Sequence, residues 1–242
     1  MKALTLLLAF SLWASSAFAQ DLADRQIAEI KADFAGKSLA DVNAALARIR
    51  PMKVTESDKK VLLQDLPLVT STNRVSDHRQ LDRLAARLRV VLELQDRAGV
   101  VDLILFRDPR PIIYNKPGVV VVLSTQVLEI VGNDDAALVG VVAHELAHEY
   151  VAILFQNAVK AHDQARLRRL ELFCDAIAVT TLLNLKLAPA GYGKALERIC
   201  THSQSAAELN DGSGSHPPLA VRLKLIGEIQ SSLSVSPANN QL

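Results

Sequence analysis

Apolar residues recur at helical spacing through the first part of the chain. Between residues 21 and 50 they are Leu22, Ile27, Ile30 and Phe34, then Leu39, Val42, Leu46 and Ile49. Gly36 divides this series, so we expect two helices here. The stretch "VTESDKKVLLQDL" predicts a third helix, because a Thr cap and an acidic first turn favour a helix start. The stretch "HRQLDRLAARLRVVLELQD" predicts a fourth helix, since its leucines and valines share one face.

The period of the pattern changes after Gly99. "VVDLILF", "IIYN" and "VVVVLS" are short, apolar and rich in β-branched residues, which predicts three strands. The last two flank Lys116-Pro117-Gly118, a sequence typical of a turn, and are expected to form a hairpin.

Helical spacing then returns and continues almost to the end of the chain. "TQVLEIV" predicts a helix, residues 132–135 a loop and cap, and the apolar stretch that follows a buried helix. Further helices are expected over about 161–185, from Pro189 onward, and after "HPP". "NDGSGS" is expected to be a loop, and residues 233–242 a loose tail. This order predicts an α+β fold that is mainly helical, with a small sheet of about three strands.

Composition narrows the classes of protein that the chain can belong to. Its 242 residues, half of them hydrophobic, suffice for one sizeable domain, or for a domain plus a helical extension. A formal charge of +1 gives no reason to expect nucleic acid or an anionic membrane surface as a partner.

The first residues have the order of a secretory signal peptide. Lys2 precedes an apolar stretch, and small residues follow, ending at Ala17-Phe18-Ala19. The apolar stretch is shorter than the roughly 20 residues that a membrane span needs. We therefore expect cleavage after about Ala19 and a mature, exported chain without a membrane span. Export permits disulfides, so Cys174 and Cys200 could form one bridge.

The stretch "VVAHELAHEY", residues 141–150, places ionisable side chains inside an apolar run. Buried polar groups need partners, because burying them alone is costly. On a helix His144 and His148 lie on the same face, and Glu145 lies beside them. This is the H-E-x-x-H arrangement, in which the two histidines bind zinc and the glutamate acts as a general base. A helix with two incidentally exposed histidines is the alternative.

A catalytic zinc usually has three protein ligands and one open position. "LRRLELFCDAIAV" offers Glu171 as the third ligand. Asp175, four residues later, could accept a hydrogen bond from a ligand histidine and fix its orientation. Cys174 is a soft ligand that could compete for the metal. The alternative is a solvated pair of carboxylates on an ordinary amphipathic helix.

A third candidate stretch is "SHPPLAVR" near the carboxyl end. His216 could donate to the oxyanion of a tetrahedral intermediate, and Arg222 could orient His216 or the glutamate carboxylates. Taken alone, the stretch is equally consistent with a water-exposed histidine at a helix start.

In this order the three stretches resemble the gluzincin metallopeptidases of the Ste-type prenyl protease, HtpX and BepA family. The resemblance covers about residues 79–230. It implies a zincin-like metallopeptidase domain over 97–232, with the sheet next to the active-site helix, and an N-terminal helical region over 20–96. One departure is "IIYNKPG", where family members often carry an Asn-Ala-Phe-Ala-type stretch before the Pro-Gly.

The resemblance further implies a zinc-dependent endopeptidase with one Zn²⁺ per chain. Its metal ligands would be His144, His148 and Glu171. Glu145 and His216 would be catalytic. An extended polypeptide substrate is expected to add a strand at the edge of "VVVVLS". Because the chain is expected in the periplasm, its substrates would be misfolded envelope proteins.

Two other functions are compatible with the same residues. One is a zinc-binding chaperone that keeps the fold and does not cleave. The other is a helical adaptor that binds its partner through residues 21–96 and whose metal site is vestigial.

Overall fold

The computed structural model describes residues 23–49, 54–203 and 216–234. The predicted signal peptide and the "NDGSGS" loop lie outside these residues. So does most of the predicted tail, but Leu233 and Ser234 continue the last helix and therefore do not belong to a loose segment.

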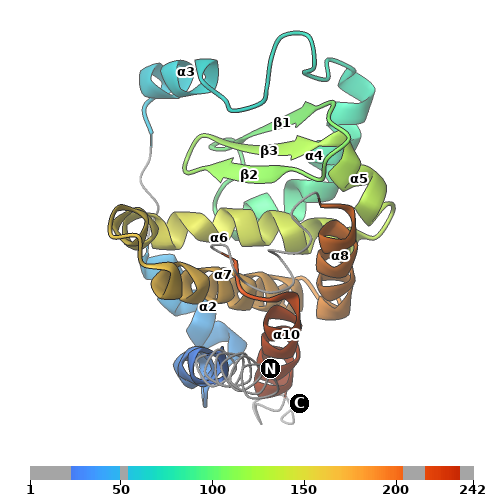
Figure 1. Ribbon diagram of the computed structural model, residues 1–242. Coiled ribbons are helices and arrows are strands. Elements are labelled where there is room, and N and C mark those ends of the chain that lie inside the picture. Colours follow the sequence, from blue (N-terminus) through green and yellow to red (C-terminus); the bar gives the residue numbers. More distant parts are fainter. Residues whose placement is uncertain (1–22, 50–53, 204–215, 235–242) are drawn as a thin grey trace, which may run out of the picture.

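A three-stranded mixed sheet forms one layer of the molecule (Figure 1). Its strands are β1 (Asp102–Phe106), β2 (Ile113–Lys116) and β3 (Val120–Ser124). They are arranged in the order β1-β3-β2, with β1 parallel to β3 and β2 antiparallel to it. The predicted hairpin is confirmed, and the α+β, mainly helical character of the chain is confirmed with it.

The central position of β3 corrects the expected site of strand addition. The "VVVVLS" strand pairs on both sides, so its backbone has no free edge. The outer strands are β1 and β2. Near the end of β1 the chain at Arg74 forms an antiparallel bridge with Phe106. Among the described residues, β2 therefore offers the edge that lies nearest to the long helix α6 (Asp135–Lys160) (Figure 1).

Apolar residues cover both faces of the sheet, which explains why β3 is buried at every position. One face joins the main core through Leu105, Val121 and Leu123. The other face forms a smaller cluster with Leu66 and the segment around α3 (Glu56–Gln64), through Ile104, Phe106, Val120 and Val122.

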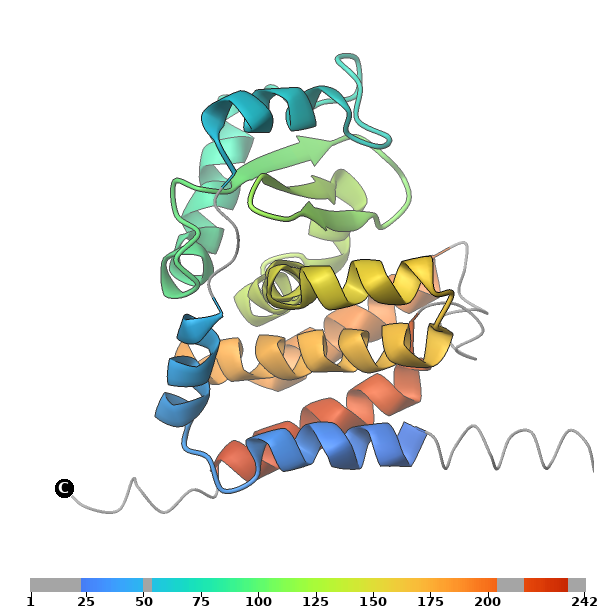
Figure 2. The same ribbon diagram turned by 90° about the vertical axis from the view of Figure 1, so that its left-hand side faces the viewer.

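Helices are stacked below the sheet, with α6 nearest to it, α7 (Gln164–Asn184) below α6, and α10 (Leu219–Ser234) below α7 (Figures 1 and 2). α6 lies between the sheet and α7, and a short turn at 161–163 folds α7 back along α6. The other helices in contact with this pair are α2 (Leu39–Arg48), α4 (His78–Leu94), α5 (Thr125–Val131), α8 (Pro189–His202) and α10. Asp134 and Asp163 cap the starts of α6 and α7 by accepting backbone hydrogen bonds.

α6 is the central helix of the fold. Among the described residues it is the one helix long and apolar enough to cross a membrane. However, 61% of its most apolar window is buried inside the protein, and it contacts the sheet as well as the helices α4, α5, α7 and α8. These contacts are those of a core helix.

The predicted N-terminal helices pack on the rest of the chain. Gly36, at φ +68°, separates a helix over residues 23–34 from α2 (Leu39–Arg48). The helix over 23–34 lies beside α10 (Figure 2), and its apolar residues belong to the same core as the sheet and α6. The helices over residues 23–34, 39–48 and 78–94 therefore share one hydrophobic core with the residues that follow them.

Gly140 is required for the close packing of α6 on α8. A Cβ at this position would lie 2.6 Å from Tyr192 Cβ. We expect Gly140→Ala to destabilise the protein by about 1–3 kcal/mol, the usual cost of overpacking a core. Urea denaturation followed by circular dichroism measures this change.

The matched control is Gly227→Ala in α10. A Cβ there meets no atom within 4 Å. Alanine is the better helix former, so this variant should be more stable by about 0.5–1 kcal/mol. Equal effects of the two substitutions would contradict the packing described here.

Candidate metal centre

Two histidines of α6 point into the interface between α6 and α7. His144 and His148 are one helical turn apart, and their ring centroids are 5.1 Å apart. His144 is buried, whereas His148 and Glu145 are partly exposed. One potential ligand atom of each of the three residues lies within 4.8 Å of the others. This group could therefore hold a metal ion.

Glu171 of α7 lies opposite both imidazoles. Its Oε2 is 3.2 Å from His144 Nε2, and its Oε1 is 3.7 Å from His148 Nε2. The Glu171 side chain is 2% exposed, and Oε2 is a buried oxygen without a hydrogen-bond partner among the described residues. A buried carboxylate that faces two imidazole nitrogens has the donor set and the unsatisfied charge that suit a divalent cation.

A second set of contacts holds His144 from behind. Its Nδ1 is 2.9 Å from Asp175 Oδ1. Arg222 of α10 donates to both carboxylate oxygens of Asp175, over 2.8 and 2.7 Å. This bidentate pair fixes the carboxylate, and the carboxylate in turn fixes the tilt of the imidazole.

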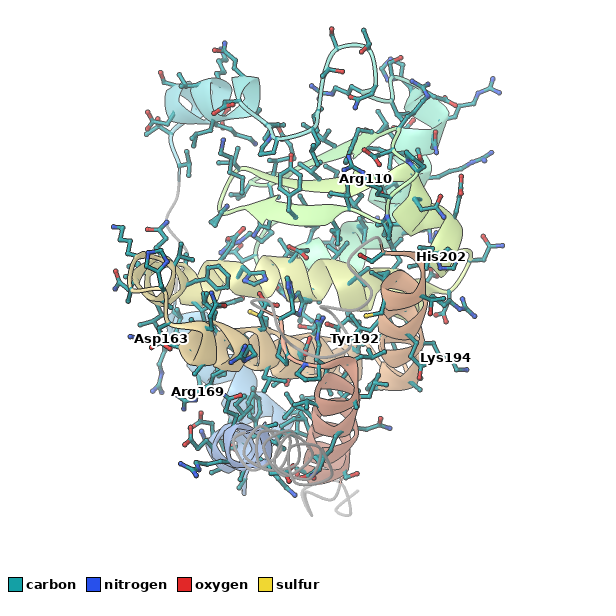
Figure 3. The ribbon with its side chains drawn as sticks, in the orientation of Figure 1. Arg110, Asp163, Arg169, Tyr192, Lys194 and His202 are labelled. Atoms are coloured by element: carbon teal, nitrogen blue, oxygen red, sulfur yellow. The ribbon has the colours of Figure 1, made fainter. Side chains whose placement is uncertain are left out.

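Tyr192 of α8 completes this second set. Its hydroxyl donates to Asp175 over 2.6 Å and lies 3.1 Å from His144 Nδ1. Figure 3 labels Tyr192 at the place where α8 approaches α7 and α10. Four helices thus contribute to the orientation of one metal-site histidine.

Neighbouring charges determine the protonation states of His144 and Glu171. Burial lowers the pKa of His144, but its contacts with Asp175 and Glu171 outweigh burial and raise the pKa to about 9. Burial raises the pKa of Glu171, but the contact with His144 outweighs it and holds the pKa at about 2. A cation bound here would take the place of the proton on His144 Nε2.

For the other two residues of the motif, the effect of burial on the pKa is the larger one, so their pKa values shift the other way. Burial lowers the pKa of His148 to about 4, so its imidazole is neutral and able to bind a metal. It raises the pKa of Glu145 to about 7, which is suited to a group that takes up and releases a proton near neutral pH.

The expected disulfide is not formed. Cys174 and Cys200 are both buried free thiols. Cys174 Sγ lies 3.7 Å from His148 Nδ1, on the side of the ring away from Glu171. The thiol is therefore a neighbour of the histidine and not a competing member of the ligand group, and burial raises its pKa.

The third stretch also reaches the site, although its two residues have different surroundings. His216 Nε2 is 3.7 Å from Glu171 Oε2, and its side chain is 45% exposed. Arg222 is buried against Asp175, so it orients that carboxylate and not His216. The expectation that Arg222 orients His216 or the glutamate carboxylates is therefore corrected: the carboxylate that Arg222 holds is that of Asp175.

Three contributors to the site could not be identified from the pattern. Tyr192 stands between two glycines at the start of α8 and resembles an ordinary core aromatic. Glu149 directly follows the second histidine, and its buried partner Arg97 lies in a distant turn. Asn115 donates from β2 to the backbone oxygen of Glu145. The one available signal was the placement of Glu149 in an otherwise apolar run.

No protein-family model matches the chain, and no curated protein sequence matches it. The functional argument therefore rests on the geometry of the site.

The pair of Asp175 and Arg222 gives a stability prediction. Replacing Arg222 by Ala removes the guanidinium that donates to both carboxylate oxygens of the buried Asp175. Breaking a buried ion pair in this way costs about 3–5 kcal/mol, and we expect a loss of that size in the free energy of unfolding. Urea denaturation in the presence of a chelator measures it without a contribution from metal binding.

Lys224→Ala is the matched control, because Lys224 lies on the same helix and pairs with Asp24 at the exposed surface. An exposed pair contributes little, so the midpoint should stay close to that of the wild type. Similar losses in the two variants would show that burial of the Arg222 pair is not the cause.

Proposed function

We propose that the protein is a zinc-dependent endopeptidase of the gluzincin type. The observation that carries this proposal is the convergence of His144 and His148 on the buried, unsatisfied carboxylate of Glu171. The partly exposed Glu145 beside them supplies the group that such a hydrolase needs as its base.

His144, His148 and Glu171 would hold the ion, which is one zinc per chain. A zinc ion held there would supply Lewis acidity, which lowers the pKa of a water from ~15.7 towards ~7. Glu145 then accepts a proton from the attacking water and delivers it to the leaving amine. Its elevated pKa suits both transfers.

The surrounding residues orient these groups. Asp175, held by Arg222 and Tyr192, fixes the ring of His144 so that Nε2 faces Glu171. His216, next to Glu171 and partly exposed, is placed to donate to the developing oxyanion of the substrate.

An extended polypeptide would bind along β2, the strand next to α6. Ser124 N donates to Ile112 O, so alternation of the antiparallel ladder directs the backbone groups of Ile113 and Asn115 away from β3. These groups form the edge at which a substrate strand can pair. We further propose the cell envelope as the location and misfolded envelope proteins as substrates, on the basis of the apparent signal sequence.

Metal analysis tests the first half of the proposal. The purified wild type should bind one zinc per chain, and Glu171→Gln or His148→Ala should lose it. Asp175→Asn should bind zinc ~10–100-fold more weakly, as expected for a residue that only orients a ligand. His202→Ala, which removes an exposed histidine of α8, should bind like the wild type. Full zinc binding by both Glu171→Gln and His148→Ala would refute the ligand set.

Cleavage of an unfolded protein such as casein tests the second half. Glu145→Gln should keep its zinc and lose ~100- to 10,000-fold in kcat, because the proton transfers lose their base. Glu129→Gln, at an exposed position of α5, should cleave like the wild type. A zinc-loaded wild type whose cleavage is no faster than that of Glu145→Gln would favour the non-cleaving chaperone or adaptor.

A further inference from the structure

Glu149, the residue after the second histidine, forms a buried cluster on another side of α6. Its side chain is 0% exposed, and Oε2 accepts a hydrogen bond from Arg97 Nε over 2.7 Å. Oε1 accepts a hydrogen bond from the backbone N–H of Gly118 over 3.0 Å. One carboxylate therefore joins three segments: the turn before β1, α6, and the turn between β2 and β3.

The β2–β3 hairpin meets α6 at a second point beside this carboxylate. Asn115 Nδ2 donates to the backbone oxygen of Glu145 over 2.9 Å and lies 3.5 Å from Glu149 Oε1. Arg97 is itself held, because its Nη1 donates to the backbone oxygen of Asp96. Glu149 therefore connects Arg97, in the turn before β1, to the hairpin that contains β2, the strand proposed to bind the substrate.

A requirement for stability alone does not explain a charged pair at this position. A well-packed apolar pair of similar volume is often as stable as a buried ion pair, or more so. Hydrogen bonds differ from apolar contacts in direction, and one of those that Glu149 accepts comes from the backbone N–H of Gly118 in the hairpin turn. Such bonds can fix where a strand lies along its neighbour.

We propose that Glu149 and Arg97 are positioning residues that set the height and register of β2 over the active-site helix. The inference rests on the proposed endopeptidase function. It states that a peptide paired with β2 presents its scissile bond at Glu145 because Glu149 and Asn115 tie the hairpin to the same helix. A shift of about 1 Å in such an alignment can cost ~100-fold in rate.

The test uses the full chain with Arg97→Met and Glu149→Leu combined, so that neither charge is left buried alone. Amide hydrogen exchange at Gly118, Ile113 and Asn115 is compared with that of the wild type, and zinc content is measured in parallel. We expect exchange at Gly118 to accelerate at least ~10-fold while zinc content is unchanged. Wild-type protection at Gly118 in the folded double variant would overturn the anchor.

Kinetics then test the consequence for substrate. Two peptides are taken from one casein cleavage site, one long enough to pair with β2 and one truncated to the residues around the scissile bond. The ratio of their kcat/KM values should fall at least ~10-fold in the double variant, because only the long peptide uses the strand. An unchanged ratio would overturn the positioning role, even if Gly118 exchanges faster.

Two further variants separate the explanations. Lys59→Met breaks another partly buried ion pair, with Asp102 of β1 at the opposite edge of the sheet, and should leave both readouts unchanged. Should the double variant not fold, Asn115→Ala removes one tie of the hairpin and should lower the same ratio. Absence of peptide cleavage by the wild type would refute the endopeptidase, whereas the exchange measurement would still decide whether Glu149 holds the hairpin.

Discussion

The contact between α6 and α7 determines what this fold can do. Burial of Glu171 against His144 and His148 costs free energy unless a proton or a cation stabilises the carboxylate. The rest of the structure maintains this contact. Asp134 and Asp163 begin the two helices at fixed points, and Gly140 permits α8 to approach closely enough for Tyr192 to reach Asp175.

α6 lies between the sheet and α7, so its different sides contact different partners. One side of α6 carries the histidines towards α7, and another carries Glu149 towards the sheet. The helix over residues 23–34 lies beside α10, α2 contacts α7, and both belong to the same core (Figure 2). The candidate metal ligands and the edge strand β2 are therefore both positioned by contacts with α6.

The sequence was informative where a single element carries the signal. Periodicity located the helices, the three strands and the hairpin, and the spacing of His144, Glu145 and His148 identified a face of the helix that could hold a metal ion. Glu171 and Asp175 could be recognised because they repeat the same four-residue spacing on the next helix. The chemistry expected of these residues is compatible with their contacts, while the identity of the metal and the reaction remain proposals.

Contacts between segments far apart in the sequence could not be predicted from the pattern of apolar and polar residues. The uniformly apolar "VVVVLS" is typical of a strand buried on both faces, but it does not indicate which strands lie on either side of it. The bonds of Arg97 to Glu149 and of Tyr192 to Asp175 join different elements of the fold, and the sequence around one residue does not predict its partner. The expected disulfide between Cys174 and Cys200 was wrong for the same reason, because the presence of two cysteines in a sequence does not show that they lie close together.

The most direct test of the account is a crystal structure of the zinc-loaded protein with anomalous data collected at the zinc edge. The account predicts one ion bound by His144 Nε2, His148 Nε2 and the carboxylate of Glu171, with Asp175 still bonded to His144 Nδ1. An anomalous peak elsewhere, or a Glu171 carboxylate that turns away from the ion, would contradict it.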